Sequence, residues 1–175
     1  DCVSSELLDY LEELNKRTFL IVEYGIESCN DDTLRFINRG HDFACTRKAL
    51  EETAKRGIYV GGHVIMGLPG EDAAESLRQA PIISSLPLTM LKIHQMQIIK
   101  GTRLAKIYKE QPFHLYTVEE YIDLITKYIG LLRSDLVLER FVTQSPPEML
   151  IAPKWGLKNY EFTNLLNNRL REMRL

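Results

Sequence analysis

Four short apolar runs lie along the chain, and segments with helical spacing separate them. The runs cover residues 18–25, 59–67, 90–99 and 136–142. The first, TFLIVEYG, is nearly continuous and rich in β-branched and aromatic residues, as expected for a strand covered on both faces. The runs therefore predict four β-strands.

Apolar residues at helical spacing predict helices before, between and after these strands. Residues 30–32 offer side-chain caps for a short helix, and Gly57 stops the next one. Strands joined through helices imply parallel pairing and hence an α/β fold. Four strands cannot close a barrel of the usual kind, so either the sheet is open or further strands precede it in a longer protein. The predicted helices are 4–16, the short helix after residue 30, 43–56, 72–85, 103–109, 117–133 and 160–173.

Size and composition favour one ordinary domain. The chain has 175 residues, 45% of them hydrophobic, and a formal net charge of -2. It lacks the basic excess usual in nucleic-acid-binding proteins. No apolar run approaches the roughly 20 residues of a membrane span, and the first residues do not follow a signal-peptide pattern. We therefore predict a cytoplasmic protein without a membrane segment.

The three cysteines are far apart in sequence. Cys2, Cys29 and Cys45 have separations much larger than those of a local metal-binding turn. We interpret them as free thiols and predict no metal ligand in this chain.

Polar or glycine-rich segments follow the first three predicted strands. Glu27 and Ser28 follow the first, and Gly67–Glu71 follows the second. Ligands of parallel α/β sheets bind beyond the carboxyl ends of the strands, so these segments are candidate ligand contacts. Loops are polar in any case, so the pattern also has a purely structural interpretation. The third strand supplies Gln95, Gln97 and Lys100.

Glu23 and His63 each interrupt an apolar strand. A buried carboxylate needs a donor nearby, and Arg39 is a candidate partner for Glu23. His63 is either a hydrogen-bonded core residue or a group that faces a ligand. Strand alternation places His94 on the face opposite the two glutamines that follow it.

Two long strings resemble known proteins. VEYGIESCNDDTLRFINRGHDFACTRKALEETAKRGIYVGGHVIMGLPGE resembles the central part of radical SAM proteins related to oxygen-independent coproporphyrinogen oxidase and to elongator-type acetyltransferases. RFVTQSPPEMLIAPKWGLKNYEFTNLLNNRL resembles the tail of a bacterial coproporphyrinogen-oxidase-like subgroup. The resemblance implies a partial TIM-type barrel with about four parallel strands and flanking helices. Residues 1–143 would form the C-terminal part of this barrel, and residues 144–175 an extension that packs on the same domain.

The resemblance also implies two cofactors, S-adenosyl-L-methionine and a [4Fe-4S] cluster that cleaves it to a 5′-deoxyadenosyl radical. Glu27 matches the position where relatives usually carry a glutamine that faces the ribose, and Arg39 matches the arginine that pairs with the cofactor carboxylate. His63 falls where some relatives have an acidic ribose contact, and Gly67–Glu71 matches the turn beside the adenine. The predicted cofactor-binding residues are Glu23, Glu27, Arg39, His63, Gly67 and Gln97.

The sequence contains no CxxxCxxC, the motif that binds the cluster in this family. We therefore expect this chain to be part of a longer radical SAM enzyme of the oxidoreductase type, with the cluster ligands upstream, and to be inactive alone. Oxygen-independent coproporphyrinogen III oxidase and a cluster-free α/β binding or scaffold module remain alternatives. A small-molecule substrate and tRNA are not distinguished. We also expect self-association through an exposed sheet edge.

Overall fold

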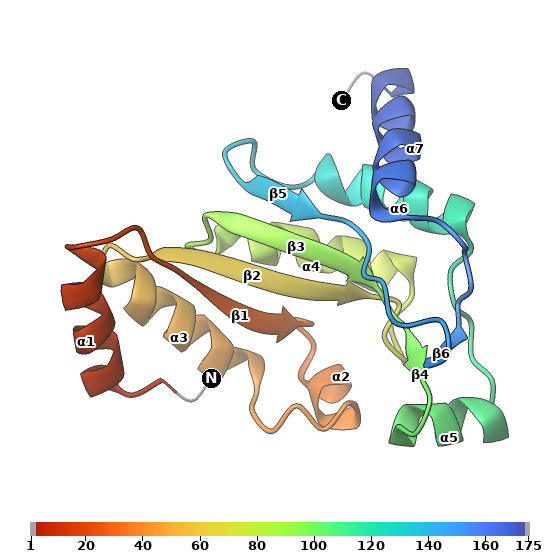
Figure 1. The fold of residues 1–175 in the computed structure, drawn as a ribbon, viewed down its shortest axis with the longest axis horizontal. Helices are drawn as coiled ribbons and strands as arrows, with labels where there is room; N and C mark the ends of the chain where they lie inside the picture. The colour runs from red at the N-terminus through yellow and green to blue at the C-terminus, as the bar shows by residue number, and fades with distance from the viewer. Residues whose placement is uncertain (1–2, 174–175) are drawn as a thin grey trace.

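The computed structural model describes residues 3–173, which form two β-sheets and seven helices (Figure 1). The larger sheet is entirely parallel, with the strand order β1-β2-β3-β5. Two further strands, β4 (Ile98–Ile99) and β6 (Leu150–Ala152), pair antiparallel in a small second sheet. The predicted α/β fold with four parallel strands is confirmed. The strands of the larger sheet are β1 (Ile21–Glu27), β2 (Tyr59–Met66), β3 (Met90–Gln95) and β5 (Val137–Arg140).

Helices make every connection within the parallel sheet. Two helices link β1 to β2, one links β2 to β3, and two lie between β3 and β5. Six of the seven begin at a residue whose side chain accepts a hydrogen bond from the first turn, which satisfies an otherwise unpaired N–H group. The helices are α1 (Ser5–Asn15), α2 (Asp31–Phe36), α3 (Phe43–Lys55), α4 (Ala73–Ser85), α5 (Arg103–Glu110), α6 (Val118–Ile129) and α7 (Asn159–Glu172).

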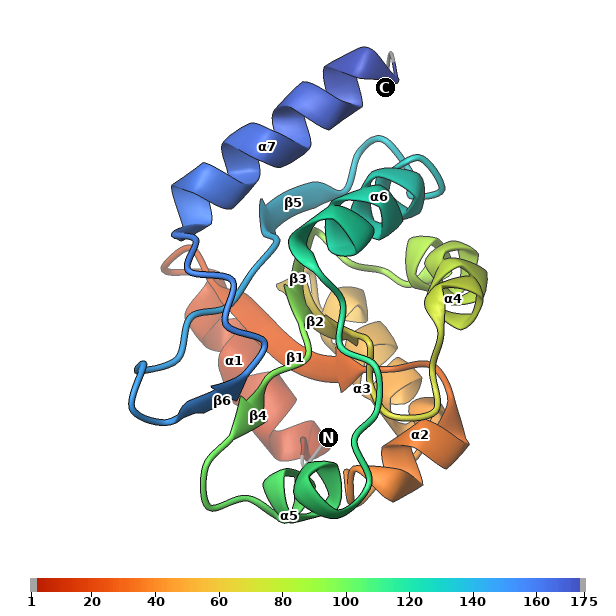
Figure 2. The same cartoon turned by 90° about the vertical axis from the view of Figure 1, so that its right-hand side faces the viewer.

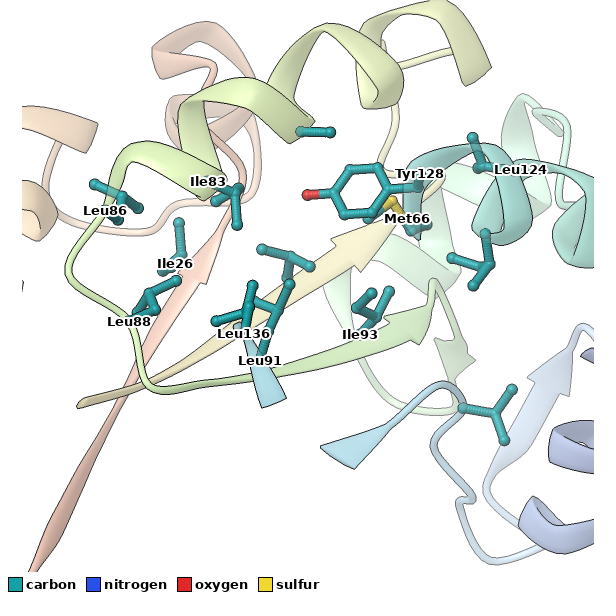
Figure 3. Packing of buried hydrophobic residues seen from close by; sticks show 14 of the residues in the cluster. Ile26, Met66, Ile83, Leu86, Leu88, Leu91, Ile93, Leu124, Tyr128 and Leu136 are labelled. Carbon is teal, nitrogen blue, oxygen red and sulfur yellow. The ribbon is translucent and has the colours of Figure 1, made fainter. Parts of the chain in front are cut away.

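The hydrophobic core lies between the parallel sheet and the helices α3, α4 and α6 (Figure 2). Side chains from alternate strand positions, such as Ile26 and Ile93, point toward Ile83 and Tyr128 on these helices (Figure 3). Gly62 leaves room in this layer, because a Cβ there would lie 2.8 Å from Ile26 Cδ1. A core side chain therefore makes the close approach at this glycine.

The opposite face of the sheet carries polar side chains. Glu23, His63 and Lys92 have side chains that are 38%, 27% and 15% exposed. In β1 only Tyr24 and Ile26, on the helix side, are buried. The prediction that the first strand is covered on both faces is therefore wrong within the described residues.

The third predicted strand, 90–99, is divided into β3 and β4. The Gln95 amide donates to the Thr143 carbonyl at 3.0 Å and accepts from the Thr143 N–H at 3.0 Å. Met96 N–H donates to the Met66 carbonyl at 2.9 Å, after which the chain leaves the parallel sheet. Side-chain hydrogen bonding to a distant loop therefore ends this strand, which apolar patterning does not reveal.

The remaining differences are the strand β6, which the sequence does not predict, and the ends of elements. The first strand runs over Ile21–Glu27 and not 18–25, and the fourth is limited to Val137–Arg140. The helix predicted over 117–133 ends at Ile129, because Gly130 caps it. Cys2, one of the predicted free thiols, lies outside the described residues.

The C-terminal helix packs against α6. Arg169 forms an ion pair with Asp123, and Phe162 is fully buried against Tyr121 at a ring-centroid distance of 5.5 Å. The boundary between residues 143 and 144 stays a prediction. Within residues 3–173, no helix combines the length and the apolar character required to cross a membrane.

Replacement of Leu91 by alanine tests the core. Leu91 is fully buried at the centre of the parallel sheet, so its removal leaves a cavity between sheet and helices. We expect Leu91→Ala to lower the free energy of unfolding by about 2–5 kcal/mol, measured by urea denaturation. Leu131→Ala, at a position 48% exposed, is the control and should change it by less than about 0.5 kcal/mol. Equal effects of the two substitutions would contradict the assignment of the core.

Candidate functional site

The carboxyl ends of the parallel strands lie together at one end of the sheet, which Figure 2 views end-on. Glu27 is the last residue of β1, Gly67 follows β2, and Gln95 ends β3. Parallel pairing therefore brings the residues predicted from three separate segments together at the carboxyl end of the sheet.

Glu27 and Arg39 lie together over Gly25. A Cβ on Gly25 would lie 2.3 Å from Glu27 Oε1 and 2.8 Å from Arg39 Nη2, so a larger residue there would displace the ends of both side chains. Arg39 Nη2 donates to the Gly25 carbonyl at 2.5 Å. Glu27 has a φ of 63°, and the pairing of β1 with β2 shifts register between Gly25 and Glu27. The irregular end of β1 therefore sets a carboxylate beside a guanidinium.

The Glu27 carboxyl is poorly solvated. Burial raises its pKa, and the positive charge of Arg39 and the nearby His63 oppose this only in part. None of the described residues donates a hydrogen bond to the Glu27 carboxylate, in contrast to Glu23, which has two donors. Glu27 therefore has acceptor capacity available for a ligand hydroxyl group.

Glu23 is paired with Lys92 and His63, and not with Arg39 as predicted. Its carboxylate accepts hydrogen bonds from Lys92 Nζ at 2.6 and 2.8 Å and lies 2.8 Å from His63 Nε2. The hydrogen bonds from Lys92 and then His63 lower the pKa of Glu23, and the bond to Glu23 raises the pKa of Lys92. Lys92 also lies 3.2 Å from Glu139 on β5. We call Glu23, His63, Lys92 and Glu139 the charged cluster; it links all four strands.

The Gly67–Glu71 loop is joined to the end of β1. Glu71 accepts a hydrogen bond from the fully buried Ser28 hydroxyl. Gly67 has a φ of 82°, and a Cβ there would lie 3.0 Å from the ring of Tyr116. Glycine is therefore required by the left-handed backbone and by the packing of Tyr116. The role of Gly67 in cofactor binding stays a prediction.

Gln97 lies apart from the other predicted residues. Its amide donates to the Thr143 carbonyl at 3.1 Å and accepts from the Ser145 hydroxyl at 2.6 Å. The structure thus places Glu27 beside Arg39, and Glu23 of β1 beside His63 of the adjacent strand β2. Gln97 instead contacts Thr143 and Ser145, which follow β5. Gly25 is the register partner of His63, which places the first two pairs side by side.

Two residues with functional geometry escape the sequence analysis. Lys92 holds Glu23, and Arg140 ends β5 with a buried Nε that has no hydrogen-bond partner within residues 3–173. Both are cations inside strands otherwise rich in apolar residues. Lys92 also alternates with the buried Leu91 and Ile93, a pattern that places it on the same face as His94. The alternation could have indicated from sequence that Lys92 lies on the polar face. It could not have indicated that Lys92 pairs with Glu23.

The binding of S-adenosylmethionine at the Glu27–Arg39 pair stays a prediction, with which the chemistry of the two side chains is compatible. The Arg39 guanidinium can meet a carboxylate, and Glu27 can accept from ribose hydroxyl groups. Across the part of the chain that the structure describes, no three histidine, cysteine, aspartate or glutamate side chains are grouped to hold a metal ion. Cys29 and Cys45 are free thiols, and burial raises the pKa of Cys29 to about 12.

Comparisons with known proteins agree with the parallel α/β fold. Residues 2–78 match the model of the radical SAM superfamily, and residues 88–172 match that of the radical SAM C-terminal domain. The chain belongs to the radical SAM superfamily. Its relatives include proteins with elongator-type names.

Three similar proteins illustrate the range. The uncharacterized protein YtqA of Bacillus subtilis is 32% identical over 170 residues, which are 97% of this chain and 53% of YtqA. The tRNA uridine(34) acetyltransferase of Methanocaldococcus jannaschii is 31% identical over 108 residues, 60% of this chain and 20% of that protein. The solved structure of Elp3 from Methanocaldococcus infernus, lacking residues 1–46, superposes with a TM-score of 0.85 at 22% identity. It covers 98% of this chain and 40% of that one, and shows the shared fold. The chain thus spans about half the length of YtqA.

Replacement of Glu27 by glutamine tests the burial of its charge. Because the folded state raises its pKa above the usual 4.5, the ionised carboxylate destabilises the fold above that pH. We expect Glu27→Gln to raise the free energy of unfolding at pH 7, and the gain to vanish as the pH falls toward 4.5. Urea denaturation between pH 4 and 8 measures it.

Glu23→Gln is the matched control with the opposite sign. The pKa of Glu23 is lowered, so its stabilisation is present above 4.5 and lost as the pH falls further. Glu23→Gln should therefore be less stable than the unchanged protein at pH 7. The same sign for both substitutions would contradict the assigned environments.

Proposed function

We propose that this chain is the S-adenosylmethionine-binding part of a radical SAM enzyme whose [4Fe-4S] cluster is held by cysteines in a preceding segment. The observation that carries the proposal is the arrangement of Glu27 and Arg39 over Gly25 at the end of β1. The superfamily match and the half-length coverage of YtqA support it. When bound, the cluster supplies the electron that cleaves S-adenosylmethionine.

The residues of this chain would bind and orient the cofactor. Arg39 is held by the Gly25 carbonyl through one nitrogen, which fixes the plane of its guanidinium for a carboxylate. The Glu27 carboxylate would accept hydrogen bonds from the ribose hydroxyl groups. These bonds would satisfy a carboxylate that is largely buried and has no hydrogen-bond donor among the described residues. The charged cluster keeps Glu23 ionised, so His63 faces a fixed negative charge next to the site.

Arg39→Lys in the full-length protein tests the cofactor site. A lysine keeps the positive charge but loses the two-pronged hydrogen bonding, so we expect at least about tenfold weaker binding of S-adenosylmethionine. Equilibrium binding of the cofactor to the anaerobically reconstituted protein measures the affinity. The yield of 5′-deoxyadenosine with dithionite as the reductant measures cleavage.

Arg35→Lys is the control, because Arg35 is exposed on α2 and, among the residues that the structure describes, forms an ion pair with Asp32 alone. It should leave affinity and cleavage unchanged. Equal affinities for the Arg39→Lys and unchanged proteins would remove Arg39 from the site. A full-length protein that forms no 5′-deoxyadenosine would refute the radical SAM assignment of activity.

Two alternatives differ in what precedes this chain. A cluster-free binding or scaffold module requires that no CxxxCxxC precede it, which the complete gene sequence decides. If the protein is an oxygen-independent coproporphyrinogen III oxidase, the CxxxCxxC motif must precede this chain. The full-length protein must also decarboxylate coproporphyrinogen III. The cytoplasmic location and self-association through an edge strand, β1 or β5, remain proposals.

A tRNA substrate is the second candidate for the reaction. One relative is named a tRNA uridine(34) acetyltransferase. Four cationic side chains lie on α5 or just before it. In the described part of the chain none of these cations forms an ion pair, so they are available to phosphate groups. They are Lys100, Arg103, Lys106 and Lys109.

The double substitution of Lys106 and Lys109 by glutamine tests this candidate. We expect binding of unfractionated tRNA to weaken at least about threefold and to depend less steeply on salt, as measured by gel-shift titration. The same change at Lys48 and Lys127, exposed lysines on α3 and α6, is the control. Equal losses in both variants would indicate only general charge attraction.

A further inference from the structure

A cavity lies beyond the ends of β3 and β5, and neither Glu27 nor Arg39 lines it. Its volume is about 510 Å³, within the roughly 300–1,000 Å³ typical of small-molecule sites. The β3–β4 junction, the segment after β5 and the segment before α7 line it, together with Phe162. Three segments distant in sequence thus form one concave surface.

One wall of this cavity is a fixed ladder of polar groups. The Thr143 carbonyl accepts from both Gln95 Nε2 and Gln97 Nε2, at 3.0 and 3.1 Å. The Thr143 N–H donates to Gln95, and the Ser145 hydroxyl donates to Gln97. These bonds satisfy much of the wall internally and hold it rigid, so it gives shape more than charge.

The opposite wall is aromatic. Trp155 Nε1–H donates to the Tyr116 carbonyl at 3.0 Å, and the indole is stacked on Phe162 with centroids 6.0 Å apart and planes inclined by 11°. Leu150 and Leu157 add apolar surface. A fixed, half-buried indole favours a flat apolar group on its remaining surface.

The charge at the cavity is positive. Lys154 and Lys158 line it on either side of Trp155, and no aspartate or glutamate of the described residues does. Neither lysine forms an ion pair within residues 3–173. Glu161, close by on α7, accepts from the backbone N–H of Lys158 at 2.7 Å. Lys158 Nζ also lies over the ring of Tyr160, 6.0 Å from its centroid. Within the described residues neither lysine has an ionic partner, so both can pair with an external anion.

We propose that this cavity binds a small organic anion with a flat apolar body, the body against Trp155 and the carboxylate or phosphate group at Lys154 and Lys158. The position beside the carboxyl ends of the sheet makes this ligand the substrate, and that last step alone rests on the proposed function. Binding itself requires neither the cluster nor S-adenosylmethionine. The 175-residue chain is therefore sufficient for the test.

Trp155 is the only tryptophan of the chain and reports on the cavity by its fluorescence. Three probes with one naphthalene body are titrated: 2-naphthoate, 2-naphthyl phosphate and the neutral 2-naphthamide. We expect at least one anion to quench Trp155 with a dissociation constant about three- to tenfold lower than that of the amide. The tighter of the two anions identifies the carboxylate or the phosphate class.

Lys154→Gln combined with Lys158→Gln should abolish the preference for the anion and leave binding of the amide unchanged. Lys127→Gln, an exposed lysine of α6 outside the cavity, is the control and should keep the preference. An amide that binds as tightly as both anions would overturn the proposal, as would a preference that survives loss of both lysines. Absence of any quenching would overturn it as well. A full-length protein that fails to cleave S-adenosylmethionine would refute the proposed function and leave this result standing.

Discussion

Parallel strand pairing is the constraint on which the rest of this structure depends. Each strand of the sheet β1-β2-β3-β5 must be reached by a crossover, so a helix occupies every connection and one face of the sheet becomes the core. The same pairing aligns all carboxyl ends at one edge. The core and the candidate site are therefore two results of one arrangement, and damage to the sheet would affect both.

The two faces of the sheet differ in what holds them. On the helix side, fully buried residues such as Ile26 and Leu91 are excluded from water. On the other side, Lys92 joins Glu23 of β1 to Glu139 of β5 across the sheet, and His63 of β2 adds to Glu23. A half-exposed charged face suits a surface that meets polar ligands, and a purely structural sheet has no need of it.

Much of the fold follows from the sequence, because its causes are local. Alternating or continuous apolar runs predict all four parallel strands, and the side chains of residues 30–32 predict a helix start that Asn30 caps in the structure. Glu27 and Arg39 could be selected by motif, and the structure brings them together. The partner of Glu23 could not be predicted, since Lys92 is 69 residues away and the choice between it and Arg39 depends on the register of three strands. The division of the third strand depends on Thr143 and is equally non-local.

The hydrogen bonds from Gln95 and Gln97 to the Thr143 carbonyl mark the boundary between the parallel sheet and the segment that follows β5. They anchor the segment after β5 at Thr143, and neither Glu27 nor Arg39 is among the described residues that line the cavity beside β3 and β5. Residues 144–158 supply Trp155 and both lysines of that cavity. Ligand preference can therefore change through one loop without any change in the residues that would hold the cofactor.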